Sequence, residues 1–276
     1  MIATDFEFLA SFLKTNSGLT LTPDKAYLIE SRLQPITVKH SKGDVAGLIN
    51  ALRSSASGDL RRDIIEAMTT NETSFFRDSK PFDIFKNEVL TKLIAARAAK
   101  KSLRIWCAAA SSGQEPYSLA IMLKDDPRLA GWKVDLIASD IDTSILAKAN
   151  AGKYSKFEVQ RGMPIQLLMK HFNKLNDDTW EVKSEIRSMV QFRQLNLLED
   201  FASIGTVDVV FCRNVLIYFD AATKGTVLEK TARRLNDDGY LFLGGAETVL
   251  GVSAAFEPSA GHRGLYVKPQ RLAKAA

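Results

Sequence analysis

The sequence predicts an α/β protein in which a small helical domain precedes a doubly wound parallel sheet. Over residues 1–68, apolar side chains recur at helical spacing and no strand pattern is found. From residue 103 onward, short apolar runs alternate with helical segments, which is typical of a parallel sheet with helices on both faces. We therefore expect a helical domain over residues 1–68, a linker with a leading helix over 69–102, and the α/β domain over 103–276.

Start and stop signals divide the first region into helices. The first helix carries Leu9 and Leu13 and is expected to end at Gly18, because glycine readily adopts the left-handed conformation that follows a helix. Thr22 and Pro23 predict the start of a second helix, which Pro35 ends or kinks. Two further helices are predicted from the apolar residues Leu48, Ile49, Leu52, Leu60, Ile64, Ile65 and Met68.

In the α/β domain, we expect strands over residues 103–107, 134–138, 207–212, 239–244 and 265–267. The intervening helices are predicted over about 82–99 and 115–124, from Asp142 to about 150, and from Asp220 to about 235. Residues 152–195 depart from this alternation. They contain an amphipathic segment (164–172) and two strand candidates (179–183 and 189–194), so we expect a small inserted β-containing subdomain there.

Composition excludes several classes of protein. The chain has 276 residues, of which 46% are hydrophobic and 25% charged, as in ordinary globular proteins. No apolar run reaches the roughly 18–20 residues that span a membrane, and the N-terminus lacks a basic export signal, so we expect a cytoplasmic protein without membrane insertion. The two cysteines, Cys107 and Cys212, are too few for a metal site. The net charge of +5 includes no basic run with interleaved aromatics, so no nucleic-acid partner is expected.

Ligands of parallel sheets bind beyond the carboxyl ends of the strands. The loop after the first strand, residues 108–116 (AAASSGQEP), has one glycine, Gly113, and does not match the dinucleotide-binding pattern G-x-G-x-x-G. Glu115 at the start of the next helix suits a cationic ligand group, or it complements the helix dipole. Asp140 suits the two hydroxyls of a ribose, or it caps a helix, a role for which Asp142 is the better candidate.

Five short stretches carry a family resemblance. They are NETSFFRD (71–78), AAASSGQEPYS (108–118), ASDID (138–142), Asn196-Leu197 and FCRNVLIYF (211–219). With these stretches in order, the chain resembles the bacterial chemotaxis receptor methyltransferases of the CheR type over essentially its full length. The resemblance implies a Rossmann-like methyltransferase that uses S-adenosylmethionine and no metal. It also implies methyl transfer to glutamate carboxylates on the cytoplasmic helices of chemoreceptors, giving glutamyl methyl esters and S-adenosylhomocysteine.

The resemblance further implies residue roles. Arg77 and Tyr218 are the expected catalytic pair, although Tyr218 could instead be a packing aromatic. The helical domain is implied to dock on the receptor, and Lys25 and Arg32, seven residues apart beside the apolar face of the second helix, are the predicted docking cations. The residues implied to surround the cofactor are Asn71, Thr73, Arg77, Glu115, Asp140, Asn196, Leu197, Arg213 and Asn214.

Members of the family that bind a receptor tail pentapeptide carry a glycine-rich loop in the inserted subdomain. The corresponding residues here, 173–179 (NKLNDDT), contain no glycine. We therefore predict a member that does not depend on a receptor tail.

The residue types fit transfer to a carboxylate. A glutamate side chain, with a pKa of about 4.3, is ionised at pH 7 and needs no general base. Arg77 can hold it through a planar guanidinium, and Tyr218 can donate one hydrogen bond. Three alternatives remain: a methyltransferase of another protein or a small acid, a cofactor-sensing module without turnover, and an NAD-dependent dehydrogenase. The presence of both Arg77 and Tyr218 argues against the sensor, and the single glycine argues against the dehydrogenase.

Overall fold

The computed structural model describes residues 2–55 and 57–269, so residues 270–276 of the predicted α/β domain lie outside the described part. The N-terminal region contains four α-helices: α1 (Ala3–Ser17), α2 (Tyr27–Lys39), α3 (Val45–Ser55) and α4 (Gly58–Met68). Their apolar faces bury one common core, to which Leu9, Leu33 and Ile49 belong. Gly18 ends α1 in the left-handed conformation (φ 78°), which confirms the expected stop signal.

One expectation for the second helix is wrong. Thr22 and Pro23 do not begin α2, because Thr22 is the N-cap and Pro23 the first residue of a separate 3-10 turn, η1 (Pro23–Lys25). Of the two outcomes expected at Pro35, the end of the helix does not occur there, since α2 continues to Lys39. Pro35 is exposed, so water can reach the carbonyl oxygen that loses its helical donor, while Leu33 and Thr37 on the buried face keep the helix packed.

The linker runs from residue 69 to a leading helix built of three segments, α5 (Lys80–Ile84), a π-helical turn η2 (Phe85–Val89) and α6 (Leu90–Ala96). A seven-stranded sheet follows, with strand order β6-β2-β1-β7-β8-β10-β9. Its parallel strands are β1 (Ser102–Ala108), β2 (Lys133–Asp140), β6 (Val190–Gln194), β7 (Val207–Cys212) and β8 (Leu235–Leu243). β10 (Leu265–Val267) pairs antiparallel with β8, and β9 (Glu257–Pro258) pairs antiparallel with β10.

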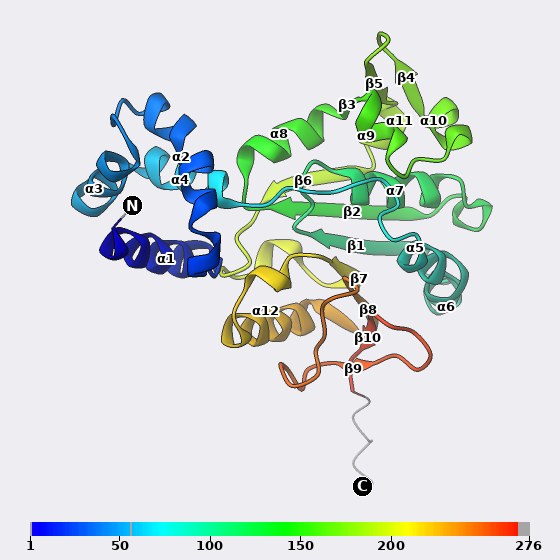
Figure 1. The fold of residues 1–276 in the computed structure, drawn as a ribbon. Helices are drawn as coiled ribbons and strands as arrows, with labels where there is room; N and C mark the ends of the chain where they lie inside the picture. Colours follow the sequence, from blue (N-terminus) through cyan, green and yellow to red (C-terminus); the bar gives the residue numbers. More distant parts are fainter. Residues whose placement is uncertain (1, 56, 270–276) are drawn as a thin grey trace, which may run out of the picture.

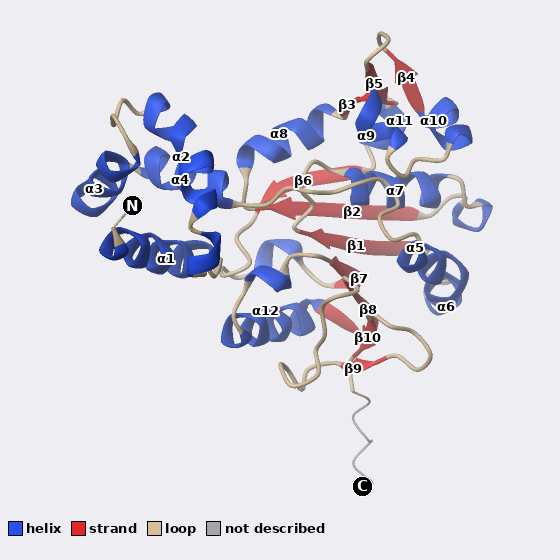
Figure 2. Ribbon diagram, viewed as in Figure 1, coloured by secondary structure: helices blue, strands red, loops and turns tan. Residues whose placement is uncertain are grey.

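Alternate residues of each strand enter two cores, one on each face of the sheet. Ile105 and Cys107 of β1 face the core that holds the leading helix and α7 (Gln114–Lys124). Trp106 of β1 faces the core that holds α12 (Ala221–Arg234). Figure 2 shows this arrangement of helices around the strands. The remaining elements of the domain are α8 (Thr143–Ala151), η3 (Pro127–Leu129), η4 (Ala202–Ile204) and η5 (Leu216–Tyr218).

The inserted segment forms a separate three-stranded antiparallel sheet with the order β3-β5-β4. Its strands are β3 (Lys153–Ser155), β4 (Phe172–Lys174) and β5 (Thr179–Val182), accompanied by α9 (Lys156–Gln160), α10 (Ile165–His171) and α11 (Ser184–Arg187). The predicted limit at residue 195 is wrong in one respect. The strand candidate at 189–194 is β6, which pairs in parallel with β2 of the main sheet because its buried Val190 continues that sheet's core.

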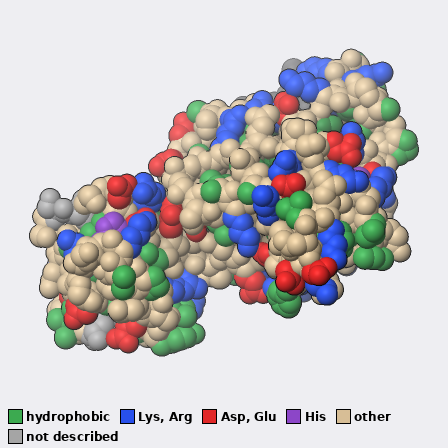
Figure 3. Space-filling model, turned by 90° about the horizontal axis from the view of Figure 1, so that it is seen from above, with side chains coloured by type: hydrophobic (Ala, Val, Ile, Leu, Met, Phe, Trp, Pro, Cys, Tyr) green, Lys and Arg blue, Asp and Glu red, His purple; other side chains and the backbone are tan. Residues whose placement is uncertain are grey.

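The helical domain lies beyond the carboxyl ends of β1, β2 and β6 (Figure 1). In the view of Figure 3 it forms a lobe of its own, and acidic and basic side chains are interspersed over both parts. Within the described residues, no helix combines the length and the apolar character needed to cross a bilayer.

The inserted subdomain contacts the linker at Gly162. Gly162 has φ +93°, and a Cβ there would lie 2.1 Å from the carbonyl oxygen of Phe75. Gly131 has a similar φ of +76° but no heavy atom within 4 Å of the added Cβ.

We predict that Gly131→Ala destabilises the fold by about 1 kcal/mol through backbone strain alone. Gly162→Ala should lower the free energy of unfolding by at least about 1 kcal/mol more than Gly131→Ala does, because the carbonyl oxygen of Phe75 must move. Urea unfolding measures the free energy of unfolding of both variants. Equal losses in the two variants would contradict a contact between Gly162 and Phe75.

Candidate active site

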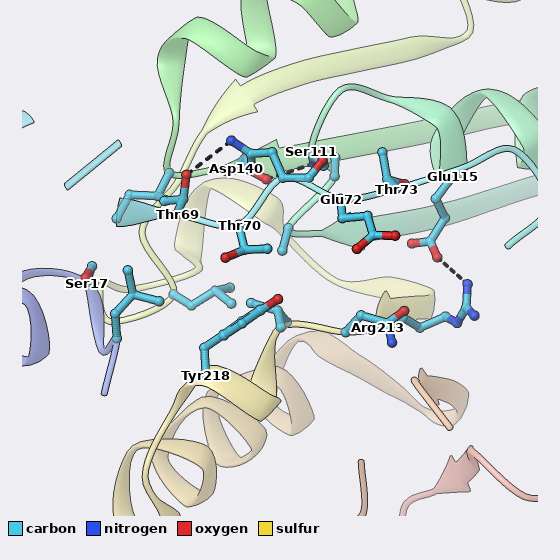
Figure 4. A pocket seen from close by; sticks show the side chains of 18 of the residues that line it. Ser17, Thr69, Thr70, Glu72, Thr73, Ser111, Glu115, Asp140, Arg213 and Tyr218 are labelled. Atoms are coloured by element: carbon cyan, nitrogen blue, oxygen red, sulfur yellow. Dashed lines mark hydrogen bonds and ion pairs between the residues drawn. The ribbon is translucent and has the colours of Figure 1, made fainter. Parts of the chain in front are cut away.

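A cavity that opens to solvent lies at the carboxyl ends of the parallel strands, between the sheet, the linker and the helical domain (Figure 4). All nine residues predicted to surround a cofactor line it, and so does Tyr218. Residues separated by more than 140 positions in the sequence, such as Asn71 and Arg213, therefore meet in one site.

Asp140 is the last residue of β2 and is buried. Its Oδ2 accepts the N–H of Ser111 at 2.8 Å, and its Oδ1 accepts the N–H of Asp142 at 3.1 Å. Burial raises the pKa of Asp140, while these two N–H donors lower it. Each carboxylate oxygen retains a lone pair for a further donor, which suits two neighbouring hydroxyls. The helix cap is Asp142, which accepts the N–H of Ile145 at 2.9 Å, so the predicted assignment of the cap to Asp142 is confirmed.

Glu115 and Arg213 form an ion pair at the floor of the cavity. The Arg213 side chain is only 1% exposed and donates to Glu115 Oε2 at 2.8 Å. Its other terminal nitrogen donates to Asp78 Oδ2 at 2.7 Å and to the carbonyl of Arg77 at 3.1 Å. Burial raises the pKa of Glu115, and the charge of Arg213 opposes this effect. Because both terminal nitrogens of its guanidinium are already bound, Arg213 acts in this geometry by holding Glu115 and the linker in place. Its buried Nε has no hydrogen-bond partner among the described residues.

Arg77 and Tyr218 lie on different elements that border the cavity. One terminal nitrogen of Arg77 donates to the carbonyl of Glu72 at 2.8 Å, which directs a half-exposed guanidinium along the linker. Tyr218 ends η5, and its carbonyl accepts the N–H of Thr20 at 2.9 Å. Figure 4 shows the Tyr218 hydroxyl directed into the cavity, opposite Thr70 and Glu72.

The amide side chains of the site connect it to neighbouring segments. The side-chain amide of Asn71 donates to Asp142 Oδ2 at 2.7 Å, and the backbone carbonyl of Asn71 accepts the Ser111 hydroxyl at 2.9 Å. Asn196 donates to the carbonyl of Asn16 at 2.6 Å, at the end of α1. The cavity is therefore closed on one side by the helical domain. The remaining predicted residues, Thr73, Leu197 and Asn214, complete the lining.

Some residues of the site were not predicted from the sequence. Ser17 and Leu19 of the helical domain line the cavity, although no local pattern marks them. Ser111 holds Asp140 through its backbone N–H, which any residue type could supply. Glu247 lies outside all five family stretches, yet its carboxylate binds the backbone of residues 214–217.

The predicted docking pair Lys25 and Arg32 does not line the cavity. The guanidinium of Arg32 is bound within the chain, and its predicted role in docking stays a prediction. Arg32 donates to the carbonyls of Met68 at 2.8 Å and Thr69 at 2.7 Å, and to the Thr70 hydroxyl at 3.1 Å. It therefore holds the start of the linker. Lys25 lies in η1, not in α2, and is exposed.

Two family models match the chain. The "CheR methyltransferase, all-alpha domain" matches residues 4–69, and the "CheR methyltransferase, SAM binding domain" matches residues 71–265. The chain belongs to the CheR methyltransferase family. It is 41% identical to Chemotaxis protein methyltransferase 1 of Pseudomonas aeruginosa, over 89% of this chain and 90% of that protein. It is 38% identical to Chemotaxis protein methyltransferase Cher2 of Pseudomonas putida, over 90% of this chain and 91% of that protein.

The cofactor of this methyltransferase is S-adenosylmethionine, which supplies a methyl group activated by the adjacent sulfonium. The cavity fits such a ligand. Asp140 offers acceptors to a ribose at one end, and Glu115 offers a buried carboxylate to an ammonium group at the other. In the described residues, no group of three or more His, Cys, Asp or Glu side chains is placed to hold a metal ion.

We propose that Asp140 holds the ribose, and this predicts the effect of Asp140→Asn. The variant loses a charged acceptor, so binding of S-adenosylhomocysteine should weaken by about 1.5–3 kcal/mol, or about one to two orders of magnitude in Kd. Asp135→Asn, at the opposite end of β2, is the matched control and should bind as the wild type does. Isothermal titration measures both. An unchanged Kd for Asp140→Asn would remove Asp140 from the cofactor site.

The raised pKa values of Asp140 and Glu115 predict a pH dependence of binding. An acid with a raised pKa takes up its proton at a higher pH than usual. We expect Asp140 and Glu115 to bind the ligand in their ionised form. As the pH falls, the Kd for S-adenosylhomocysteine should begin to rise above about pH 4.3, the ordinary value for glutamate. Circular dichroism at each pH shows whether the protein is folded. A Kd that stays constant down to about pH 4 in folded protein would contradict this assignment.

Proposed function

We propose that this methyltransferase esterifies glutamate side chains of chemoreceptors, giving glutamyl methyl esters and S-adenosylhomocysteine. The supporting observation is the composition of the cavity. The residues that line it include two arginines and a tyrosine but no histidine, lysine or cysteine. An amine or alcohol acceptor must lose a proton to a base, whereas a carboxylate is already ionised at neutral pH. The three carboxylates of the lining are already engaged: Asp140 accepts a backbone N–H group, Glu115 binds Arg213, and Glu72 binds Arg161. A lining without a free base therefore favours a carboxylate acceptor. The relatives are named chemotaxis protein methyltransferases, and we therefore propose that the acceptor carboxylate belongs to a chemoreceptor.

In this proposal, the chain's residues position the acceptor and exclude water. The carbonyl of Glu72 holds one nitrogen of Arg77, which leaves the rest of the guanidinium to bind one oxygen of the incoming carboxylate. Tyr218 donates a hydrogen bond to the acceptor from the opposite wall. The free carboxylate oxygen then lies within about 3–3.5 Å of the methyl carbon, in line with the bond to sulfur. The new C–O bond forms as the C–S bond breaks, and the electron pair of that bond stays on sulfur.

We propose roles for the other regions on the same basis. The helical domain, residues 1–68, borders the cavity through Ser17 and Leu19, so a receptor docked on it would lie beside the methyl-transfer site. The loop of the inserted subdomain remains the basis for predicting independence from a receptor tail. Its residues 175–178 form a short glycine-free connection between β4 and β5.

The proposed reaction can be tested with methyl-labelled S-adenosylmethionine and membranes that contain chemoreceptors. Label on the receptor band that alkali releases as methanol identifies a carboxyl methyl ester, as we expect. Alkali-stable label would indicate methylation of nitrogen instead. Labelling that is absent from receptors although the protein binds S-adenosylmethionine would favour the cofactor-sensing module.

Substitution of Arg77 separates substrate positioning from cofactor binding. Arg77→Lys keeps the charge but loses the planar pair of donors, so kcat should fall about tenfold to a hundredfold. The Kd for S-adenosylhomocysteine should change much less. Arg233→Lys on the exposed side of α12 is the control and should be fully active. Near-normal turnover of Arg77→Lys would show that this guanidinium does not position the acceptor.

Charge reversal at Lys25 tests docking without disturbing the linker that Arg32 holds. Lys25→Glu should slow receptor methylation and make the rate less sensitive to salt, because an attractive long-range charge is lost. Lys92→Glu, an exposed lysine on α6, makes the same change in net charge away from the helical domain. If both variants show the same salt profile as the wild type, Lys25 is not part of the docking surface.

A further inference from the structure

One buried carboxylate outside the predicted site accepts an unusual number of backbone hydrogen bonds. Glu247 follows β8 and is 8% exposed. Its Oε1 accepts the N–H groups of Val215 at 2.9 Å, Leu216 at 2.7 Å and Ile217 at 3.3 Å. Its Oε2 accepts the N–H groups of Asn214 at 2.8 Å and Gly244 at 2.6 Å. Five donors thus converge on a group with about four lone-pair sites, so its hydrogen-bonding capacity is filled.

Four of these donors are the N–H groups of consecutive residues, 214–217, so the carboxylate binds a whole segment of backbone. The loop of residues 214–217 has its N–H groups on one side because Asn214 adopts a left-handed conformation, with φ +60°. Successive N–H groups in such a conformation form a concave anion site, and here the anion is a side chain of the same chain. This segment follows β7 and includes the first two residues of η5. Its two neighbours in sequence, Arg213 and Tyr218, both line the cavity.

On the other side of this contact, a side chain at Gly244 would crowd both partners. A Cβ at Gly244 would lie 2.7 Å from both Asn214 Nδ2 and Glu247 Oε2, and 3.0 Å from the backbone nitrogen of Asn214. The neighbouring Gly245 has no heavy atom within 4 Å of an added Cβ. The end of β8 therefore lies close to the segment of residues 214–217, and the Glu247 carboxylate binds both.

We propose that Glu247 is a positioning residue of the methyltransferase. Its carboxylate holds residues 214–217 in the one arrangement in which Asn214 and Tyr218 face the cofactor cavity from the same loop. Without it, four consecutive N–H groups lose their partner, and the segment must turn toward water or toward other acceptors. Cofactor affinity and methyl transfer then fall, while the sheet and its helices stay folded. The kinetic part of this inference rests on the proposed function, and the structural part does not.

Two variants with matched controls test the inference. Glu247→Gln keeps the shape but turns an N–H₂ group toward N–H donors. Gly244→Ala places a methyl group against the same contact from the opposite side. The controls are Glu229→Gln, an exposed glutamate of α12, and Gly245→Ala. For each protein, we would measure amide hydrogen exchange by residue, the Kd for S-adenosylhomocysteine and kcat for receptor methylation.

We expect both test variants to exchange the amides of residues 214–217 at least tenfold faster, with β1 and β7 protected as in the wild type. Their Kd should rise at least threefold and their kcat should fall at least tenfold. Both controls should match the wild type. Unchanged exchange at 214–217, or faster exchange spread evenly over the sheet in both variants, would overturn the inference. A wild type that binds S-adenosylhomocysteine but does not methylate receptors would refute the proposed function alone. The exchange and Kd measurements would then still decide the role of Glu247.

Discussion

The buried pair of Arg213 and Glu115 holds together the parts of the chain that form the cavity. Arg213 follows β7, Glu115 begins α7, and the same guanidinium reaches Asp78 and the carbonyl of Arg77 in the linker. Removing one partner of such a buried pair would leave an uncompensated charge, at a cost of about 3–5 kcal/mol. The linker is therefore not a passive connection. It is held against the strand ends by an interaction that only a completed sheet can supply.

Backbone strain is concentrated at this junction. Eight residues other than glycine have positive φ among those that the structure describes. Six of them lie in the linker, in the loop after β1 or directly after β7: Phe76, Asp78, Ser79, Ala109, Ser111 and Asn214. Left-handed conformations are unfavourable for Phe, Ser and Ala and less so for Asp and Asn, so tertiary contacts help to maintain them. The ion pair with Arg213 holds Asp78, the contact with Asp140 holds Ser111, and the carboxylate of Glu247 holds Asn214.

Local signals in the sequence predicted the elements that depend on neighbours in the chain. Gly18 ends a helix, Asp142 and Asp220 cap helices, and β1, β2, β7 and β10 lie where apolar runs predicted strands. β8 begins four residues before the predicted start at residue 239, and the short β9 was not predicted. The expected cluster at the carboxyl ends of the strands followed from the parallel topology, which brings Glu115 and Asp140 to one edge.

Long-range contacts could not be predicted in the same way. Pro35 remains inside a helix because the helical core packs its other face, and β6 joins the main sheet through pairing with β2. Arg32 is occupied by carbonyls 36 and 37 residues away. In each case the deciding partner is distant in the sequence, and periodicity and spacing carry no information about it.

We propose that one cavity presents the methyl group of S-adenosylmethionine to a carboxylate held by Arg77 and Tyr218. A crystal structure of the protein with S-adenosylhomocysteine is the decisive test. We expect ribose hydroxyls on Asp140, the amino group beside Glu115, and the sulfur facing the space between Arg77 and Tyr218. A ligand bound elsewhere, or bound in this cavity with its sulfur turned away from that space, would contradict it.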